Sequence, residues 1–178
     1  MTKLAEGSFN KVFLLTMDTG KQLIARIPHP NAGPPHYTTA SEVATMHYLR
    51  TRLQLPVPRV LAYSCDATNP VGSEYILMER INGVSLSKKW DTLTAAKKAK
   101  ILVCLTELQT KMLNTRFSAY GNLYFTADVP RALCVPQMYK EPSADDNIYC
   151  IGPTTEYQFW EPDRRPNRGP CITPKRAF

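Results

Sequence analysis

The sequence predicts an α+β fold in which one helix lies on a five-stranded antiparallel sheet. Short connections join the apolar segments before residue 28, and connections of that length suit antiparallel neighbours. One stretch of helical periodicity then lies between residues 38 and 55, and two further short apolar segments lie before residue 82. The first 82 residues are therefore predicted to run strand, strand, strand, helix, strand, strand.

The first three strands are predicted at residues 2–6, 10–17 and 21–27. The pair Gly7-Ser8 turns the chain between the first two strands. The triplet Asp18-Thr19-Gly20 suits the second hairpin turn, because glycine accepts a positive φ. These three segments form one half of the expected sheet.

The helix is predicted to follow a loop at residues 28–37, which contains four prolines and a glycine. Thr39 is the expected N-cap, and Glu42 three residues later completes a capping box. Pro56 stops the helix. The apolar stripe consists of Val43, Met46, Leu49 and Leu53.

Two more strands are predicted at residues 59–65 and 75–81, with a loop at 66–73 between them. The second contains the continuous apolar run expected of an internal strand, and Asn82-Gly83 ends it. Residues 1–82 are therefore expected to form one structural unit.

Residues 83–163 are expected to form a second unit, with a helix at about residues 94–114. A short strand or hairpin is expected at 120–125, and a mostly irregular, proline-rich segment follows from residue 130. Within that segment, Phe159-Trp160 is expected to pack against another part of the protein. Residues 164–178 lack periodicity and are expected to be a poorly ordered tail. The helix stripe, predicted to pack as core, consists of Leu102, Leu105, Leu108 and Met112.

Composition restricts the classes of partner. The 178 residues include 22 Lys plus Arg and 15 Asp plus Glu, which gives a formal charge of +7. That balance suits an anionic ligand such as a nucleotide. The basic residues do not form one concentrated run or accompany a known module, so we expect no nucleic-acid partner.

The five cysteines are spaced widely and irregularly, which argues against a disulfide framework and a zinc site and favours a reducing compartment. No apolar run approaches the roughly 20 residues of a membrane span, and this chain shows no targeting segment. We therefore expect an intracellular protein, cytoplasmic or mitochondrial, without a membrane span.

Four features could act together on a phosphate-bearing ligand. The turn at Gly7 and Ser8 could place N–H groups and a hydroxyl on a phosphate, and Arg26 could pair with the same group. Glu42 could hold Arg26 in place, and the backbone after Met78 could hydrogen-bond an adenine. Three of these features also have a simpler explanation: the turn as an ordinary hairpin turn, Arg26 as a surface arginine on an edge strand, and Glu42 as part of a helix cap.

The order of these motifs resembles the aminoglycoside phosphotransferase and choline kinase-like family, in a fungal branch that includes proteins linked to mitochondrial inheritance. The resemblance implies a protein-kinase-like fold that transfers the γ-phosphoryl group of ATP to a small-molecule hydroxyl. It implies an N-terminal lobe, then a helix and an irregular insertion from the start of a C-terminal lobe. The motifs are residues 6–12, 25–28, 31–35, 40–46, 56–60, 74–79 and 151–154.

By this resemblance, Gly7, Ser8 and Asn10 belong to a loop that covers the nucleotide phosphates. Arg26 stands where the family has a Lys or Arg that pairs with those phosphates. Glu42 is then the helix partner of that cation.

The same resemblance places Met78 at the back of an adenine pocket. The backbones of Glu79 and Ile81 then correspond to the hinge that hydrogen-bonds adenine. ATP is the implied cofactor, with Mg²⁺ in the complete family enzyme.

The family's catalytic loop, His-Gly-Asp followed by Asn, and its later metal-binding Asp are absent. None of His29, His36 and His47 has an Asp two residues on, and no Asp-x-Asp occurs. We therefore expect no catalytic and no metal-ligating residue here, and an N-terminal fragment that is inactive alone with an unknown acceptor. The alternatives are a non-catalytic interaction module of pseudokinase type and, ranked last, a nucleic-acid binder.

Overall fold

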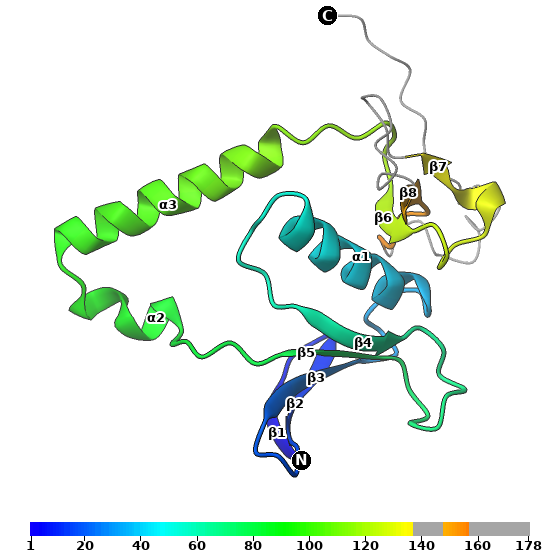
Figure 1. Ribbon diagram of the computed structural model, residues 1–178, viewed down its shortest axis with the longest axis horizontal. Coiled ribbons are helices and arrows are strands. Elements are labelled where there is room, and N and C mark those ends of the chain that lie inside the picture. Colours follow the sequence, from blue (N-terminus) through cyan, green and yellow to red (C-terminus); the bar gives the residue numbers. More distant parts are fainter. Residues whose placement is uncertain (137–147, 157–178) are drawn as a thin grey trace, which may run out of the picture.

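The computed structural model describes residues 1–136 and 148–156, and in it a helix, α1, lies between two antiparallel sheets (Figure 1). The larger sheet has the strand order β1-β2-β3-β5-β4, which confirms the predicted α+β fold. Its strands are β1 (Thr2–Glu6), β2 (Asn10–Thr16), β3 (Gln22–Pro28), β4 (Val60–Ser64) and β5 (Tyr75–Glu79).

The two predicted hairpin turns connect β1 to β2 and β2 to β3. Gly20 adopts φ 79°, and its N–H donates to the Met17 carbonyl at 2.8 Å, so this turn requires the conformation that glycine supplies. The Gly7 N–H donates to the Asn10 carbonyl at 3.0 Å and closes the first turn. Strand ends differ from prediction by one or two residues.

Helix α1 (Tyr37–Thr51) begins earlier than predicted, and the predicted capping box is wrong. The residue before the helix is His36, with φ 67°, and no side chain of the helix caps it. The Thr39 hydroxyl is buried and instead donates at 2.5 Å to the carboxylate of Glu74, which precedes β5. Glu74, which is distant in sequence, therefore stabilises the start of α1 in place of the predicted capping box.

One face of α1 packs on the larger sheet. Val43 is 2% exposed and forms a cluster with Ile76 and Met78 of β5. Ile24 of β3 and Val60 of β4 pack against the same cluster. This apolar contact positions α1 over β3, the strand that carries Arg26.

The opposite face of α1 contacts a smaller sheet with the strand order β6-β8-β7. Ala40 of α1 is fully buried with Tyr124 and Cys150. The strand expected at 120–125 is confirmed, whereas β7 and β8 were not predicted. The strands of the smaller sheet are β6 (Asn122–Phe125), β7 (Val135–Pro136) and β8 (Tyr149–Gly152), and the 3-10 turn η2 (Arg131–Leu133) lies between β6 and β7.

One disulfide links Cys134 to Cys150, and the cysteine spacing did not predict it. The two Cα atoms lie 5.6 Å apart although the residues are 16 positions apart in sequence. The irregular spacing of the cysteines did not indicate this pairing, because it is the strand β8 that brings Cys150 beside Cys134. The expectations for Phe159-Trp160 and for residues 164–178 lie outside the described residues.

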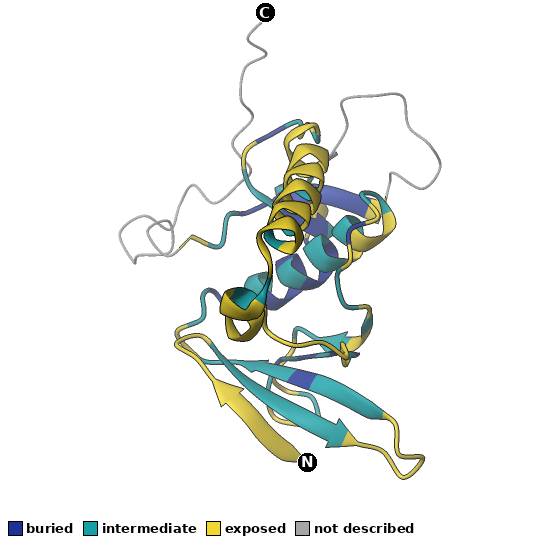
Figure 2. Cartoon of the chain, turned by 90° about the vertical axis from the view of Figure 1, so that its left-hand side faces the viewer, coloured by how far each residue is buried: buried dark blue, intermediate teal, exposed yellow. Residues whose placement is uncertain are grey.

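The segment after β5 contains α2 (Leu86–Lys89), the 3-10 turn η1 (Trp90–Thr92) and α3 (Ala95–Leu113). The Thr94 hydroxyl caps α3 by accepting from the Lys97 N–H at 3.4 Å. No residue of α3 is buried (Figure 2), and the helix stands away from both sheets (Figure 1). The prediction that its apolar stripe packs as core is therefore wrong for the described part of the chain, where Leu102 is 55% and Leu105 45% exposed.

Within residues 1–136 and 148–156, no helix is both long enough and apolar enough to cross a membrane.

Candidate functional site

The side of the larger sheet that faces α1 carries one cation among apolar side chains. Arg26 lies opposite Val12 of β2 and opposite Ile76 of β5 in the strand register. Because alternate residues of a strand point to opposite faces, Arg26 shares its face with Ile24, which packs in the α1 cluster. β3 lies between β2 and β5, so the interpretation of Arg26 as an edge-strand arginine is wrong.

Arg26 forms an ion pair with Glu42 of α1. The two side chains remain 24% and 36% exposed, so the pair lies at the border of the interior. Burial lowers the pKa of the Arg26 guanidinium, but arginine stays charged at neutral pH. The structure thus brings together two of the predicted site residues and leaves the pair partly open to solvent.

The turn between β1 and β2 lies near the end of β3 that follows Arg26, because Asn10 pairs with Pro28. Asn10 is two residues before Val12, so its side chain lies on the same face as Arg26. The Gly7 N–H is used within the hairpin, and a side chain at Gly7 would meet no atom within 4 Å. Ser8 is exposed at the tip of the turn. Among these residues, the Ser8 hydroxyl and the Asn10 amide are the groups best placed to reach a ligand.

The predicted adenine-binding residues lie at the end of β5. Met78 is 9% exposed and pairs across the sheet with Ile24. The Glu79 N–H donates to the Arg59 carbonyl at 3.0 Å, which leaves this amide unavailable to a ligand. Ile81 lies beyond the strand and is 58% exposed. The end of β5 is thus next to the strand that carries Arg26.

Glu74 is a residue that the sequence reasoning missed. It is 8% exposed, accepts the His36 N–H at 2.6 Å, and accepts the Thr39 hydroxyl with its other oxygen. Negative charge at a helix N-terminus is favourable, and Glu74 supplies it where the first turn of α1 has no acidic residue. Glu74 therefore fixes the end of α1 from which Glu42 follows one turn later. No local signal identifies it, because its partners are 35 and 38 residues away.

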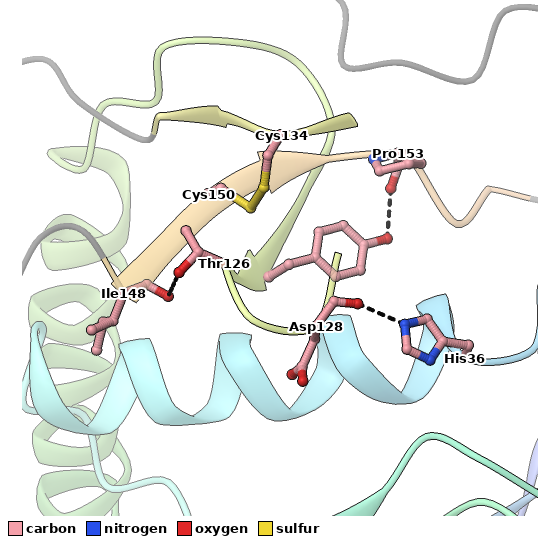
Figure 3. Close-up of a disulfide and its surroundings, with 8 residues drawn as sticks. His36, Thr126, Asp128, Cys134, Ile148, Cys150 and Pro153 are labelled. Atoms are coloured by element: carbon pink, nitrogen blue, oxygen red, sulfur yellow. Dashed lines mark hydrogen bonds between the residues drawn. A yellow bond between two sulfur atoms is a disulfide. The ribbon is translucent and has the colours of Figure 1, made fainter. Parts of the chain in front are cut away.

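Asp128, between β6 and η2, connects three elements near the same end of α1. Its carbonyl contacts His36 Nε2 at 2.6 Å (Figure 3). Its carboxylate accepts the Tyr63 hydroxyl of β4 at 2.9 Å. Burial, together with the Asp128 charge, raises the pKa of the nearby Cys65 thiol to about 12. The second sheet thus holds α1 and β4 through a polar contact as well as an apolar one.

A pocket of about 330 Å³ lies beside the N-terminus of α1. It is lined by the proline-rich loop after β3, by Lys11, and by Ser73 and Glu74. Thr38 of α1 also lines it, so the pocket lies at the end of the sheet where α1 begins. Neither Arg26 nor Glu42 lines it, and it is therefore separate from the ion pair.

In the part of the chain that the structure describes, no group of three or more His, Cys, Asp or Glu side chains is arranged to hold a metal ion.

Comparison with known proteins identifies the family. Residues 1–137 match the phosphotransferase enzyme family. A subtelomeric hrmA-associated cluster protein of Aspergillus fumigatus is 48% identical over the whole of this chain, which corresponds to 34% of that protein. The mitochondrial protein named altered inheritance of mitochondria protein 9, of Candida albicans, is 37% identical over 89% of this chain and 27% of its own length.

The chain thus spans about a third or less of the length of these relatives. The family match covers both the sheet that carries Arg26 and the helix that carries Glu42. The chain belongs to the phosphotransferase enzyme family, with the sheet-and-helix arrangement of a kinase-like N-terminal lobe.

Proposed function

We propose that this chain forms the nucleotide-phosphate-binding half of an ATP-dependent small-molecule phosphotransferase. The ion pair between Arg26 and Glu42 is the observation that carries the proposal. A cation held by a helix carboxylate, at the partly open border of a sheet, suits the binding of phosphate oxygens. Family membership supports ATP as the nucleotide.

The chemistry proposed for this half is electrostatic positioning. Arg26 binds the phosphates and Glu42 keeps the guanidinium in place, while Ser8 and Asn10 approach from the turn beyond. Adenine is proposed to bind near Met78, with Glu79 accepting through its carbonyl and Ile81 donating through its N–H. In enzymes of the family Mg²⁺ would neutralise phosphate charge, and among the described residues no group of three or more His, Cys, Asp or Glu side chains is arranged to hold it.

Catalysis by this chain alone is not part of the proposal. Phosphoryl transfer needs an oriented hydroxyl and a base, and the family's His-Gly-Asp pattern does not occur in the sequence. We therefore propose nucleotide binding without turnover, and an acceptor bound by parts of the relatives that this chain does not span. A mitochondrial location is proposed because relatives carry that location in their names.

A second candidate function is a non-catalytic interaction module. The exposed stripe of α3 favours it, because Leu102, Leu105 and Met112 are each more than 40% exposed. Contiguous exposed apolar side chains are typical of surfaces that bind another protein.

Titration with ATP tests the proposal and separates the two functions. Wild type is expected to bind ATP, and Arg26→Ala is expected to weaken binding at least about tenfold, because a charged contact to phosphate contributes roughly 1.5–3 kcal/mol. Arg116→Ala, which removes an exposed arginine from the connection between α3 and β6, is the matched control and should bind like wild type. Absence of ATP binding by wild type would refute the proposal and leave the interaction module.

A further inference from the structure

We propose that the Cys134–Cys150 disulfide is a reversible thiol–disulfide site, and that its oxidation state controls how firmly residues 126–136 hold the N-terminal end of α1. We call residues 126–136 the clamp segment. It connects β6 to β7 and includes Asp128 and Val129. Figure 3 shows the disulfide with Asp128 and His36 nearby.

The clamp segment contacts the first turns of α1 and strand β4. Val129 is 4% exposed in the cluster that contains Ala40 of α1. The Asp128 carbonyl contacts His36 at the start of α1, and the Asp128 carboxylate accepts the Tyr63 hydroxyl. The end of α1 that precedes Glu42 is therefore held by this segment as well as by Glu74.

The disulfide is the strongest attachment of the C-terminal end of the clamp segment. Within the described residues, β7 pairs with β8 at two positions, Val135 with Ile151 and Pro136 with Cys150. Proline has no N–H, so Pro136 donates nothing to this short ladder. Two residue pairs with one donor missing form a weak attachment, whereas the covalent bond fixes Cys134 directly to the central strand of the small sheet.

The two sulfurs differ in accessibility. Cys150 is 1% exposed, whereas Cys134 is half-buried, so a reductant is expected to attack the Cys134 sulfur. Cys65 packs against the same cluster, but its raised pKa keeps it a thiol and a poor nucleophile at neutral pH. An internal exchange with Cys65 is therefore disfavoured, and we propose an external dithiol as the reductant.

The reaction balances with that dithiol as the co-reactant. Its thiolate attacks Cys134 Sγ, a mixed disulfide forms, the Cys134–Cys150 bond breaks, and Cys150 leaves as a thiolate that takes a proton. The second thiol of the reductant then attacks its own sulfur in the mixed disulfide, releases the Cys134 thiolate, which takes a proton, and forms the reductant's disulfide. The protein gains two electrons and two protons, and the dithiol loses the same number.

Reduction removes the covalent link. Among the described residues it leaves the Thr126 bond to Ile148, the packing of Val129, the short β7 pairing and the Asp128 contacts. The clamp segment should then open locally while the larger sheet and the Glu74 bonds to α1 remain. An effect of this local opening on ATP affinity rests on the proposed function, because the opening would act through α1 and Glu42. The primary test therefore uses amide hydrogen exchange, which needs no nucleotide.

Hydrogen exchange is measured on the full chain before and after treatment with dithiothreitol, with mass spectrometry to verify the Cys134–Cys150 link. We expect amides of residues 126–136 and of the first turn of α1 to exchange at least about tenfold faster after reduction, and to regain protection on reoxidation. Amides of β2 and β3 should change little. Equal exchange in both states, or absence of the linked peptide under oxidising conditions, would overturn the proposal.

Two variants control for other effects of dithiothreitol. Cys65→Ser should keep the full redox difference, because Cys65 takes no part in the exchange. The double variant Cys134→Ser/Cys150→Ser should exchange like reduced wild type, with or without dithiothreitol. If the double variant does not fold, the wild-type comparison still decides the proposal, and loss of the redox difference in Cys65→Ser would contradict it.

Discussion

Helices α1 and α3 arise from the same kind of sequence pattern and reach opposite environments. Both have apolar residues at helical spacing, yet α1 lies between two sheets and α3 has no buried residue in the described structure (Figure 2). α1 is fixed by segments distant in sequence, whereas α3 is capped by its own Thr94. The comparison shows that hydrophobic periodicity predicts the presence of a helix. Contacts with segments distant in sequence decide whether that helix is packed firmly enough to position functional residues.

The largest expected effect comes from the distant cap of α1. Glu74→Ala leaves the His36 N–H and the Thr39 hydroxyl without their acceptor in a buried position. We expect a loss of about 3 kcal/mol in the free energy of unfolding, since each unsatisfied buried group costs about 1–3 kcal/mol. Urea unfolding followed by circular dichroism measures it.

Glu107→Ala is the matched control, because it removes an exposed carboxylate from α3. Its expected effect is within about 0.5 kcal/mol of wild type. Equal stability of the Glu74 and Glu107 variants would show that the buried carboxylate does not anchor α1.

A pair of valines tests the packing difference with identical chemistry. Val43 of α1 is 2% exposed, and Val103 of α3 is 59% exposed. Val43→Ala should lower the free energy of unfolding by about 2 kcal/mol through lost burial and a residual cavity, and Val103→Ala by less than about 0.5 kcal/mol. Chemical denaturation of both variants measures the difference, and comparable losses would mean that α3 is packed as firmly as α1.

The cap of α3 should have a smaller effect than the cap of α1. Thr94→Ala removes one exposed side-chain cap, which costs at most about 1 kcal/mol. Because α3 stands away from both sheets, the loss should appear as lower helicity of residues 95–113 in hydrogen exchange. An effect of Thr94→Ala on the exchange of α1 would contradict the independence of the two helices.

The smallest effect concerns the contact of α1 with β8. His47 Nδ1 lies 2.6 Å from the Tyr149 hydroxyl, and burial, with a further contribution from Arg52, lowers the pKa of His47. Because the pKa of His47 is lower in the folded protein, the unfolded chain binds the proton at a higher pH than the folded chain does. The contribution of neutral His47 to the free energy of unfolding is therefore complete above the unfolded pKa of about 6.5 and declines as pH falls through that value. Urea midpoints at pH 7.5 and 5.5 should differ less in His47→Gln than in wild type, and an unchanged difference would exclude His47 as the cause.

The sequence was sufficient for the larger sheet, because hairpin turns such as the one at Gly20 and short apolar runs are local signals. It also suggested the pairing of Arg26 with Glu42, as a hypothesis that the family resemblance strengthened and that periodicity did not supply. It failed at the start of α1, where Glu74 replaced the predicted capping box from 35 residues away. Local propensity does not carry such distant contacts.

The second sheet illustrates the same limit. Residues 149–152 are too short to signal a strand on their own, and they are stabilised by β6 and by burial against α1. The Cys134–Cys150 disulfide depends on that pairing and was likewise invisible from spacing. In α3 the stripe correctly predicted a helix, but it contained no information about where that helix would lie.

The ratio of the affinities for ATP and adenosine tests the central claim most directly. If α1 presents Glu42 so that Arg26 binds phosphate, wild type should bind ATP more tightly than adenosine. Arg26→Ala should lose most of that preference, at least about tenfold, while keeping its affinity for adenosine. A preference for ATP that survives in Arg26→Ala, or its absence in wild type, would contradict the account.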